Sequence, residues 1–199
     1  VQADAIGTGF ASFNGSSDYI DISSAYTLLN GYGNMTICCW VYVEPDCAQY
    51  ARIWSTADDG SNDQNFLMIN TTAGQFRFEA ETSAGAGTGV NGIDGDGLWT
   101  HCACVYDDVA NKIHLYNNGI LQNSASLGGT IEAKDFIVGA RNDTPDNEFK
   151  GKVSQLGIWQ GALTQAAIQE VKEKSFAELS ASDKSTLGSE MIPNVNFDT

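Results

Sequence analysis

Alternating apolar and polar positions dominate the chain up to Gln160 and predict a series of short β-strands. Gln75–Glu81 is the clearest case, because Phe76 and Phe78 alternate with polar and charged residues. A side-chain period of two places successive residues on opposite faces of a sheet. Further strands, bounded by Gly, Asn, Asp or Pro, are predicted within Gly9–Ile22 (two strands), Met35–Pro45, Ala51–Thr56, Phe66–Asn70, Leu98–Asp108, Asn111–Ser124, Phe136–Asp143 and Phe149–Gln160.

Two segments break this alternation. Thr82–Gly97 is rich in Gly and poor in apolar residues, so it is predicted to be a loop. Leu163–Glu190 holds helix formers with spaced apolar residues and predicts one or two short amphipathic helices, the second with a capping box at Ser180 and Asp183. The expected fold is all-β: a two-sheet antiparallel β-sandwich (jelly roll) over 1–162, a C-terminal helical segment over 163–190, and a tail or linker over 191–199.

Charge narrows the choice of partners. The formal net charge is −15, from 25 acidic and 10 basic residues. Such a surface repels nucleic-acid phosphates and anionic membranes, and is compatible with divalent cations and neutral ligands such as sugars. No apolar run approaches the roughly 18–20 residues of a membrane span, so membrane insertion is not expected.

The five cysteines leave two alternatives open. Cys38 and Cys39 lie on one predicted strand and Cys102 and Cys104 on another, so one disulfide between these strands is conceivable. The other interpretation is that they are small buried apolar residues, because free Cys packs well in cores. Their spacing does not fit a zinc site.

Two polar loops offer oxygen ligands. Asp58–Asn65 (DDGSNDQN) and Ala140–Glu148 (ARNDTPDNE) are rich in carboxylates and carboxamides, which are ligands that Ca²⁺ prefers. Neither fits the EF-hand pattern, so a site would need both loops. The alternative is that Asp, Asn and Gly are simply turn formers.

Several segments in order carry a family resemblance: FNGSSDYIDI, MTICCWVYVEP, GLWTHCACVYD, KIHLYNNGILQ, FIVGARND and FKGKVSQLGIWQGALTQAAI. Over about residues 9–172 the chain resembles the concanavalin A-like lectin/glucanase superfamily, specifically jelly rolls of the laminin G/pentraxin type. The helical tail resembles one that follows such modules in bacteriophage virion proteins. The resemblance implies two antiparallel sheets and, in many members, calcium held by loops at a sheet edge.

The resemblance also implies a set of metal ligands. Asp63 and Gln64 match the first ligand loop, and Asn142 and Asp143, followed by Asn147, match the second. Arg141 stands where the family pattern has a carboxylate, so at most one Ca²⁺ is expected.

Aromatic and acidic residues beside the first loop suggest where a sugar would bind. Tyr50 and Trp54 border this loop and are candidates for a stacking platform, with Asp58 and Asp59 to bond sugar hydroxyls. The glucanase pattern Glu-x-Asp-x-x-Glu is absent: Glu79 and Glu81 share one face of a strand, but no third acid follows at the required interval. No catalytic residue is therefore predicted.

The leading hypothesis is a non-catalytic, calcium-dependent glycan-binding or adhesion module at an extracellular or virion surface. Its partner would be a glycan or a host-surface polysaccharide. The alternative is a structural or decoration jelly roll that binds other virion proteins and no sugar.

Overall fold

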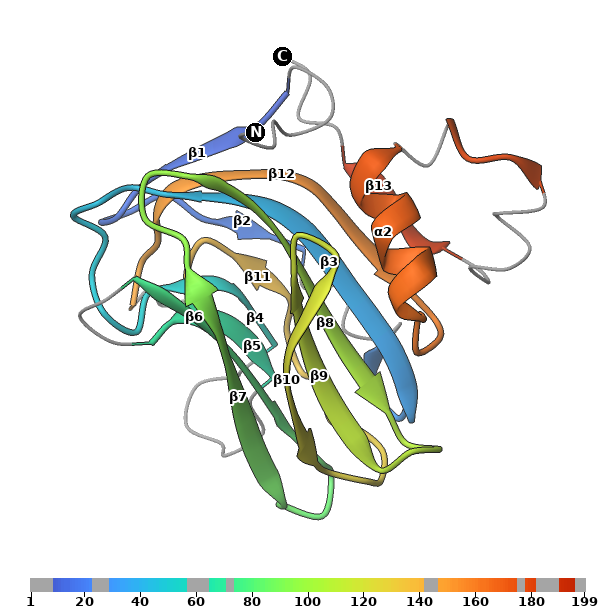
Figure 1. Ribbon diagram of the computed structural model, residues 1–199. Helices are drawn as coiled ribbons and strands as arrows, with labels where there is room; N and C mark the ends of the chain where they lie inside the picture. The colour runs from blue at the N-terminus through green and yellow to red at the C-terminus, as the bar shows by residue number, and fades with distance from the viewer. Residues whose placement is uncertain are drawn as a thin grey trace.

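The computed structural model describes residues 9–22, 29–56, 65–70, 74–141, 147–174, 178–181 and 190–195. Within these residues the strands form two antiparallel sheets that pack face to face (Figure 1). The predicted all-β sandwich is therefore confirmed. No helix of the described chain is both long enough and apolar enough to span a bilayer.

The first sheet is built around three long central strands. Its order is β1-β12-β3-β8-β9-β10, and β13 also pairs with β12, which gives seven strands in the described part of the chain. The strands span Ala11–Asn14 (β1), Asn34–Val43 (β3), Trp99–Asp107 (β8), Lys112–Asn117 (β9), Ile120–Ser126 (β10), Lys150–Trp159 (β12) and Glu190–Val195 (β13).

The second sheet contributes six strands to the described residues, in the order β2-β11-β4-β5-β6-β7. They span Ile20–Asp21 (β2), Arg52–Ser55 (β4), Phe66–Ile69 (β5), Gln75–Glu81 (β6), Gly87–Asp94 (β7) and Ile137–Val138 (β11). The prediction of a loop over Thr82–Gly97 was wrong, because Gly87–Asp94 pairs with β6 along its length. Pairing with a well-ordered neighbour and inward burial of Val90 outweigh the low strand propensity of glycine here.

The main core lies between the sheets. Alternate residues of β6, Phe76, Phe78 and Ala80, are buried in it, as are Ile37 and Val41 of β3. Each buried aliphatic or aromatic side chain contributes roughly 1.5–3 kcal/mol through removal from water. The apolar positions of the alternating pattern therefore face this layer between the two sheets.

A second, smaller core lies under the helix α2 (Gln165–Glu173), on the other face of the first sheet. The Thr164 side chain accepts a hydrogen bond from the Ala167 N–H and caps the helix. Ile168 and Val171 are buried against strands β3, β8 and β12, where they pack in one cluster with Trp159. The first of the predicted helices is confirmed.

The C-terminal prediction needs one correction. Residues 191–199 were expected to be a tail or linker, but Glu190–Val195 form β13, which pairs with the second half of β12. The strand fills the sheet edge that β1 leaves uncovered, since β1 pairs with the first half of β12. The second predicted helix, after Ser180, falls mostly outside the described residues.

The sheet cysteines are packing residues. Cys39 lies directly opposite Cys102 across β3 and β8, yet all five cysteines are free thiols. Burial raises the pKa of the Cys39 thiol to about 12, so the thiol stays protonated and apolar. The disulfide alternative is not realised.

His101 makes the stability of the fold depend on pH. Its side chain is 2% exposed, its ring packs edge-on against Trp40, and Nδ1 has no hydrogen-bond partner among the described residues. Burial, with a smaller effect of Lys172, lowers the pKa of His101 from 6.5 to about 3. The folded state therefore favours the neutral ring, and the stability that this provides is present above pH 6.5 and lost as the pH falls towards 3.

We therefore expect the unfolding free energy of His101→Gln to fall less steeply than that of the wild type as the pH is lowered below 7. Between pH 7 and 4, the wild type should lose about 3 kcal/mol more unfolding free energy than the variant. Urea unfolding at several pH values measures this difference, and the carboxylates common to both proteins cancel in the comparison. Parallel curves for the two proteins would contradict the assignment.

Candidate functional site: a polar pocket on the six-stranded sheet

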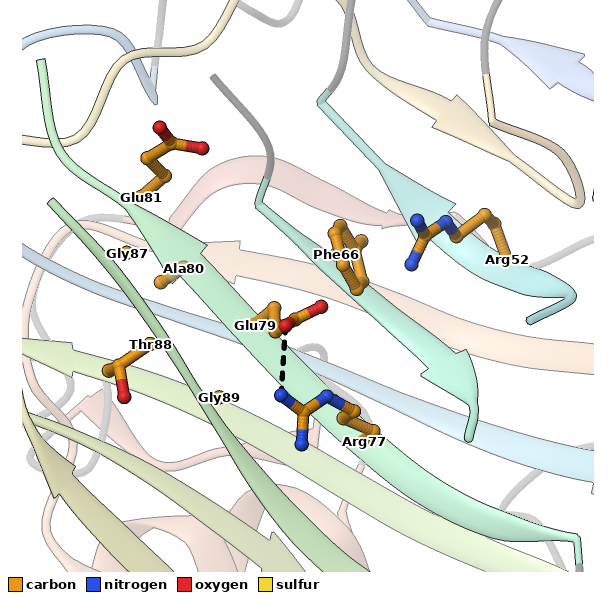
Figure 2. Close-up of a pocket in the computed structure, with 9 residues that line it drawn as sticks. All are labelled: Arg52, Phe66, Arg77, Glu79, Ala80, Glu81, Gly87, Thr88 and Gly89. Carbon is orange, nitrogen blue, oxygen red and sulfur yellow. Dashed lines mark hydrogen bonds and ion pairs between the residues drawn. The ribbon is translucent and has the colours of Figure 1, made fainter. Parts of the chain in front are cut away.

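An open pocket of about 630 Å³ lies on the outer face of the second sheet (Figure 2). Strands β4, β5, β6 and β7 supply all of its lining. The lining residues are Arg52, Phe66, Arg77, Glu79, Ala80, Glu81, Gly87, Thr88 and Gly89. A volume in the range of roughly 300–1,000 Å³ is typical of small-molecule sites.

The alternation of β6 places the charged residues in this pocket. Phe76, Phe78 and Ala80 fill the core, so the residues between them, Arg77 and Glu79, must face outward. The same period brings Glu81 to the pocket, where Asn65 accepts a hydrogen bond from its backbone N–H.

Arg77 is held in place by two acceptors. Its Nη2 lies 2.9 Å from Oε1 of Glu79, and its Nη1 donates to Oδ1 of Asn91 at 3.1 Å. The side chains of Arg77 and Glu79 are 25% and 32% exposed, so the pair is open to solvent and to a ligand. An ion pair this exposed adds little stability, roughly 0–1 kcal/mol, which makes binding a better explanation for it than folding.

Glycines on the edge strand β7 leave room for this ion pair. Gly87 and Gly89 pair with Glu81 and Glu79. A Cβ atom at Gly89 would lie 2.5 Å from both Nη2 of Arg77 and Cγ of Glu79, which is too close. The Arg77–Glu79 pair therefore extends over β7 only because position 89 lacks a side chain.

Arg52 forms the opposite wall. Its guanidinium carbon lies 3.4 Å from the ring centroid of Phe66, and its Nη1 lies 2.9 Å from the sulfur of Met68. Arg52 is 8% exposed, and stacking on Phe66 fixes the plane of its guanidinium group. The pocket thus combines two guanidinium groups with two carboxylates.

The expected stacking platform is only partly available. Trp54 is 1% exposed and stacks on Phe136 in the core at 6.1 Å between ring centroids, so its assignment as a sugar platform was wrong. A β-bulge between Arg52 and Trp54 turns the Trp54 ring inward beside Ile53. Tyr50 is 52% exposed and has a positive φ of 65°; its ligand role stays a prediction.

Most residues of the predicted calcium site lie outside the described part of the chain. This holds for Asp58, Asp59, Asp63 and Gln64 of the first loop, and for Asn142 and Asp143 of the second. Asn147 is described, and its carbonyl accepts a hydrogen bond from the Arg52 N–H at 2.8 Å. Its proposed metal-binding role stays a prediction.

The described residues that flank these two segments lie at opposite ends of β4. Asn147 is bonded to Arg52, at the start of the strand, whereas Thr56, which follows the end of the strand, precedes the first loop and bonds to Asn65 after it. Thr56 lies four positions after Arg52, which is about 13 Å along an extended strand. Among the described residues, no group of three or more His, Cys, Asp or Glu is placed to hold a metal ion.

The pocket residues were missed by sequence reasoning, although a signal was present. Glu79 and Glu81 were correctly placed on one strand face, but they were considered only as catalytic acids. Arg77 alternates with the same buried residues and so shares the face of Glu79 and Glu81. Gly87 and Gly89 have no side chains, so side chains of a neighbouring strand can extend over them. Arg52 precedes the bulge and faces outward because its neighbour Ile53 is in the core, but sequence reasoning did not connect it with the β6 residues.

Comparison with known proteins gives a consistent family. The family model described as "Concanavalin A-like lectin/glucanases superfamily" matches residues 14–169. The chain is 24% identical over 168 residues to the rat (Rattus norvegicus) protein "Sushi, von Willebrand factor type A, EGF and pentraxin domain-containing protein 1". The match covers 78% of this chain and 5% of the rat protein, so the chain corresponds to a small part of that relative.

Solved structures show the same fold. The heptameric SAP-like pentraxin of Limulus polyphemus superposes with a TM-score of 0.61 at 18% identity, covering 82% of this chain and 81% of the pentraxin. The CBM40 module of the Ruminococcus gnavus IT-sialidase, solved bound to α2,3-sialyllactose, gives a TM-score of 0.66 at 17% identity. That match covers 85% of this chain and all (100%) of the module.

The burial of Trp54 leads to a stability prediction. Trp54→Ala should lower the unfolding free energy by about 3–5 kcal/mol, because it removes a large ring from the core. Tyr50→Ala should change it by less than about 0.5 kcal/mol, because the ring is largely exposed. Urea unfolding of both variants measures these changes. Equal losses of unfolding free energy would contradict the prediction, because they would mean that the two rings are equally buried.

Proposed function

Because the chain belongs to the concanavalin A-like lectin/glucanase superfamily, we propose that it is a non-catalytic module that binds a glycan. The proposed binding site is the pocket on the outer face of the six-stranded sheet. The observation that carries this proposal is the gathering of Arg52, Arg77, Glu79 and Glu81 around one open pocket.

The chemistry of the pocket suits a polyhydroxylated ligand. Guanidinium groups donate several hydrogen bonds and carboxylates only accept them, so together they can bond hydroxyl groups in both directions. The edge strand supplies Gly87 and Gly89, which leave that side of the pocket without bulky side chains. The similarity in fold to a sialidase module solved with sialyllactose supports this proposal.

Two observations favour binding without catalysis. The Glu-x-Asp-x-x-Glu pattern of glucanases is absent from the sequence. Of the two pocket glutamates, Glu79 already accepts a hydrogen bond from Arg77 at 2.9 Å, so its carboxylate is engaged within the protein. Release of sugar products from oligosaccharides by the purified protein would contradict this part of the proposal.

We place the module at an extracellular or virion surface, where it would contact glycans displayed by a cell or a host. The strongly acidic surface supports this, because it favours solubility and disfavours nucleic-acid partners. The alternative, a structural jelly roll that binds only proteins, is distinguished by the glycan-binding experiment below.

The pocket assignment predicts different effects for a glycine in the pocket and a glycine outside it. Gly89→Ala should weaken glycan binding about tenfold, because its Cβ would displace the Arg77–Glu79 pair. Gly161→Ala is the matched control: Gly161 does not line the pocket and its added Cβ would meet no atom within 4 Å, so binding should change less than about twofold. A glycan array identifies ligands for the wild type, and calorimetry then compares the three proteins.

Two results would count against this assignment. If the two variants bind as tightly as the wild type, the glycan site lies elsewhere on the molecule. If the wild type binds no glycan on the array, the protein-binding alternative gains support. Thermal unfolding of both variants verifies that each one is folded before binding is compared.

We also propose that Ca²⁺ stabilises the protein through the two polar loops that contain Asp63 and Asp143. Saturation at a hundredfold excess over the dissociation constant would add about 2.7 kcal/mol, a rise in melting temperature of about 5–10 °C. Asp63→Asn should abolish this rise, whereas Glu173→Gln, which removes an exposed helix carboxylate, should not. An unchanged wild-type melting temperature after chelation would overturn the calcium proposal and leave the glycan proposal intact.

A further inference from the structure

The distribution of arginine points to the class of glycan. The whole chain carries a net charge of −15 and has three arginines, Arg52, Arg77 and Arg141. Two of the three line the same pocket. These two arginines give the pocket guanidinium donors that can bond to a carboxylate, although the chain as a whole is strongly acidic.

Arg77 retains unused hydrogen-bond donors. A guanidinium group has about five N–H donors. The two bonds to Glu79 and Asn91 each use one of them, on Nη2 and Nη1. Within the described part of the chain nothing else bonds to the remaining N–H groups, including Nε–H, so they are available to a ligand in the pocket. Because the two bonds already fix the guanidinium plane, little side-chain entropy is lost when a planar carboxylate binds to it.

Arg52 adds a second, rigid positive charge. Its contacts with the Phe66 ring and the Met68 sulfur hold it against the sheet beside the pocket. Arg52 is 8% exposed, and a buried charge interacts more strongly with a nearby carboxylate than a fully solvated charge does. Figure 2 shows Arg52 and Arg77 projecting from β4 and β6 at the same pocket.

The two glutamates limit how much negative charge the ligand carries. Glu79 and Glu81 balance the formal charges of the two arginines, so a polyanion such as a sulfated chain or a nucleic acid would be repelled. A sugar ring with a single carboxylate can bond to both kinds of charged side chain. Its carboxylate bonds to a guanidinium group, and its hydroxyls donate to Glu81.

We propose that the pocket binds a glycan through one carboxylate-bearing sugar, with Arg77 as the principal carboxylate ligand and Arg52 as the supporting charge. This inference rests on the proposed glycan-binding function and specifies its ligand class. Sialic acids and uronic acids share this chemistry, and the experiment distinguishes them.

The test compares acidic sugars with neutral partners of the same skeleton by calorimetry on the full chain. The pairs are α2,3-sialyllactose with its methyl ester, and methyl galacturonoside, which carries a single carboxylate, with its methyl ester. At least one acidic member should bind ten times more tightly than its neutral partner. Arg77→Gln should weaken binding of that ligand about tenfold to a hundredfold, the usual effect of losing a charge-assisted hydrogen bond.

Two variants control for charge and geometry. Arg77→Lys keeps the charge but loses the planar fork, so its affinity should fall between the wild type and Arg77→Gln. Lys112→Gln removes one positive charge at an exposed position on β9, outside the pocket, and should leave binding unchanged. A loss in Lys112→Gln equal to that in Arg77→Gln would mean that net charge alone determines binding.

The outcomes separate this inference from the proposed function. If neutral and acidic partners bind equally, or only the neutral ones bind, the pocket is a glycan site and the carboxylate preference is wrong. If Arg77→Gln binds the acidic sugar as well as the wild type does, Arg77 is not its ligand. If neither pair binds and an array of neutral and acidic glycans shows no ligand, the proposed function and this inference both fail.

Discussion

The inward packing of alternate β6 residues determines much of the candidate site. Phe76 and Phe78 are buried between the sheets, and a strand cannot bury one residue without turning its neighbours to the other face. Arg77 and Glu79 are therefore held outward by the same free energy that stabilises the core. A slip of one residue in register would bury the charged pair and expose two phenylalanines, at a cost that the fold could not sustain.

The neighbouring edge strand, β7, differs from β6: its extended conformation depends on pairing with β6 rather than on its own sequence pattern. Gly87 and Gly89 have low strand propensity, and nothing in their own sequence favours an extended ladder. β6 supplies the hydrogen-bonding partner, and Val90 supplies one inward anchor. Glycine at position 89 is then an advantage, because the Arg77–Glu79 pair extends across the strand into the space that a side chain would take.

These two strands illustrate how much of the protein could be predicted from its sequence. Strong alternation, as in β6, reports on the face that a residue occupies, so the sandwich and the shared face of Glu79 and Glu81 were predictable. The strand character of Gly87–Asp94 was not, because it arises from pairing between segments. Trp54 was misplaced for a third reason: a bulge changes the face of every later residue in its strand, and periodicity alone does not locate bulges.

The same bulge connects the core to the binding chemistry. It turns Trp54 inward beside Ile53, while Arg52, which precedes it, lies on the outer face and stacks its guanidinium on Phe66. Phe66 faces away from the main core but is 3% exposed, so it serves as a support for the arginine. Cation–π stacking of a poorly solvated guanidinium contributes up to about 2 kcal/mol. The contact therefore stabilises the sheet and holds a guanidinium group beside the pocket.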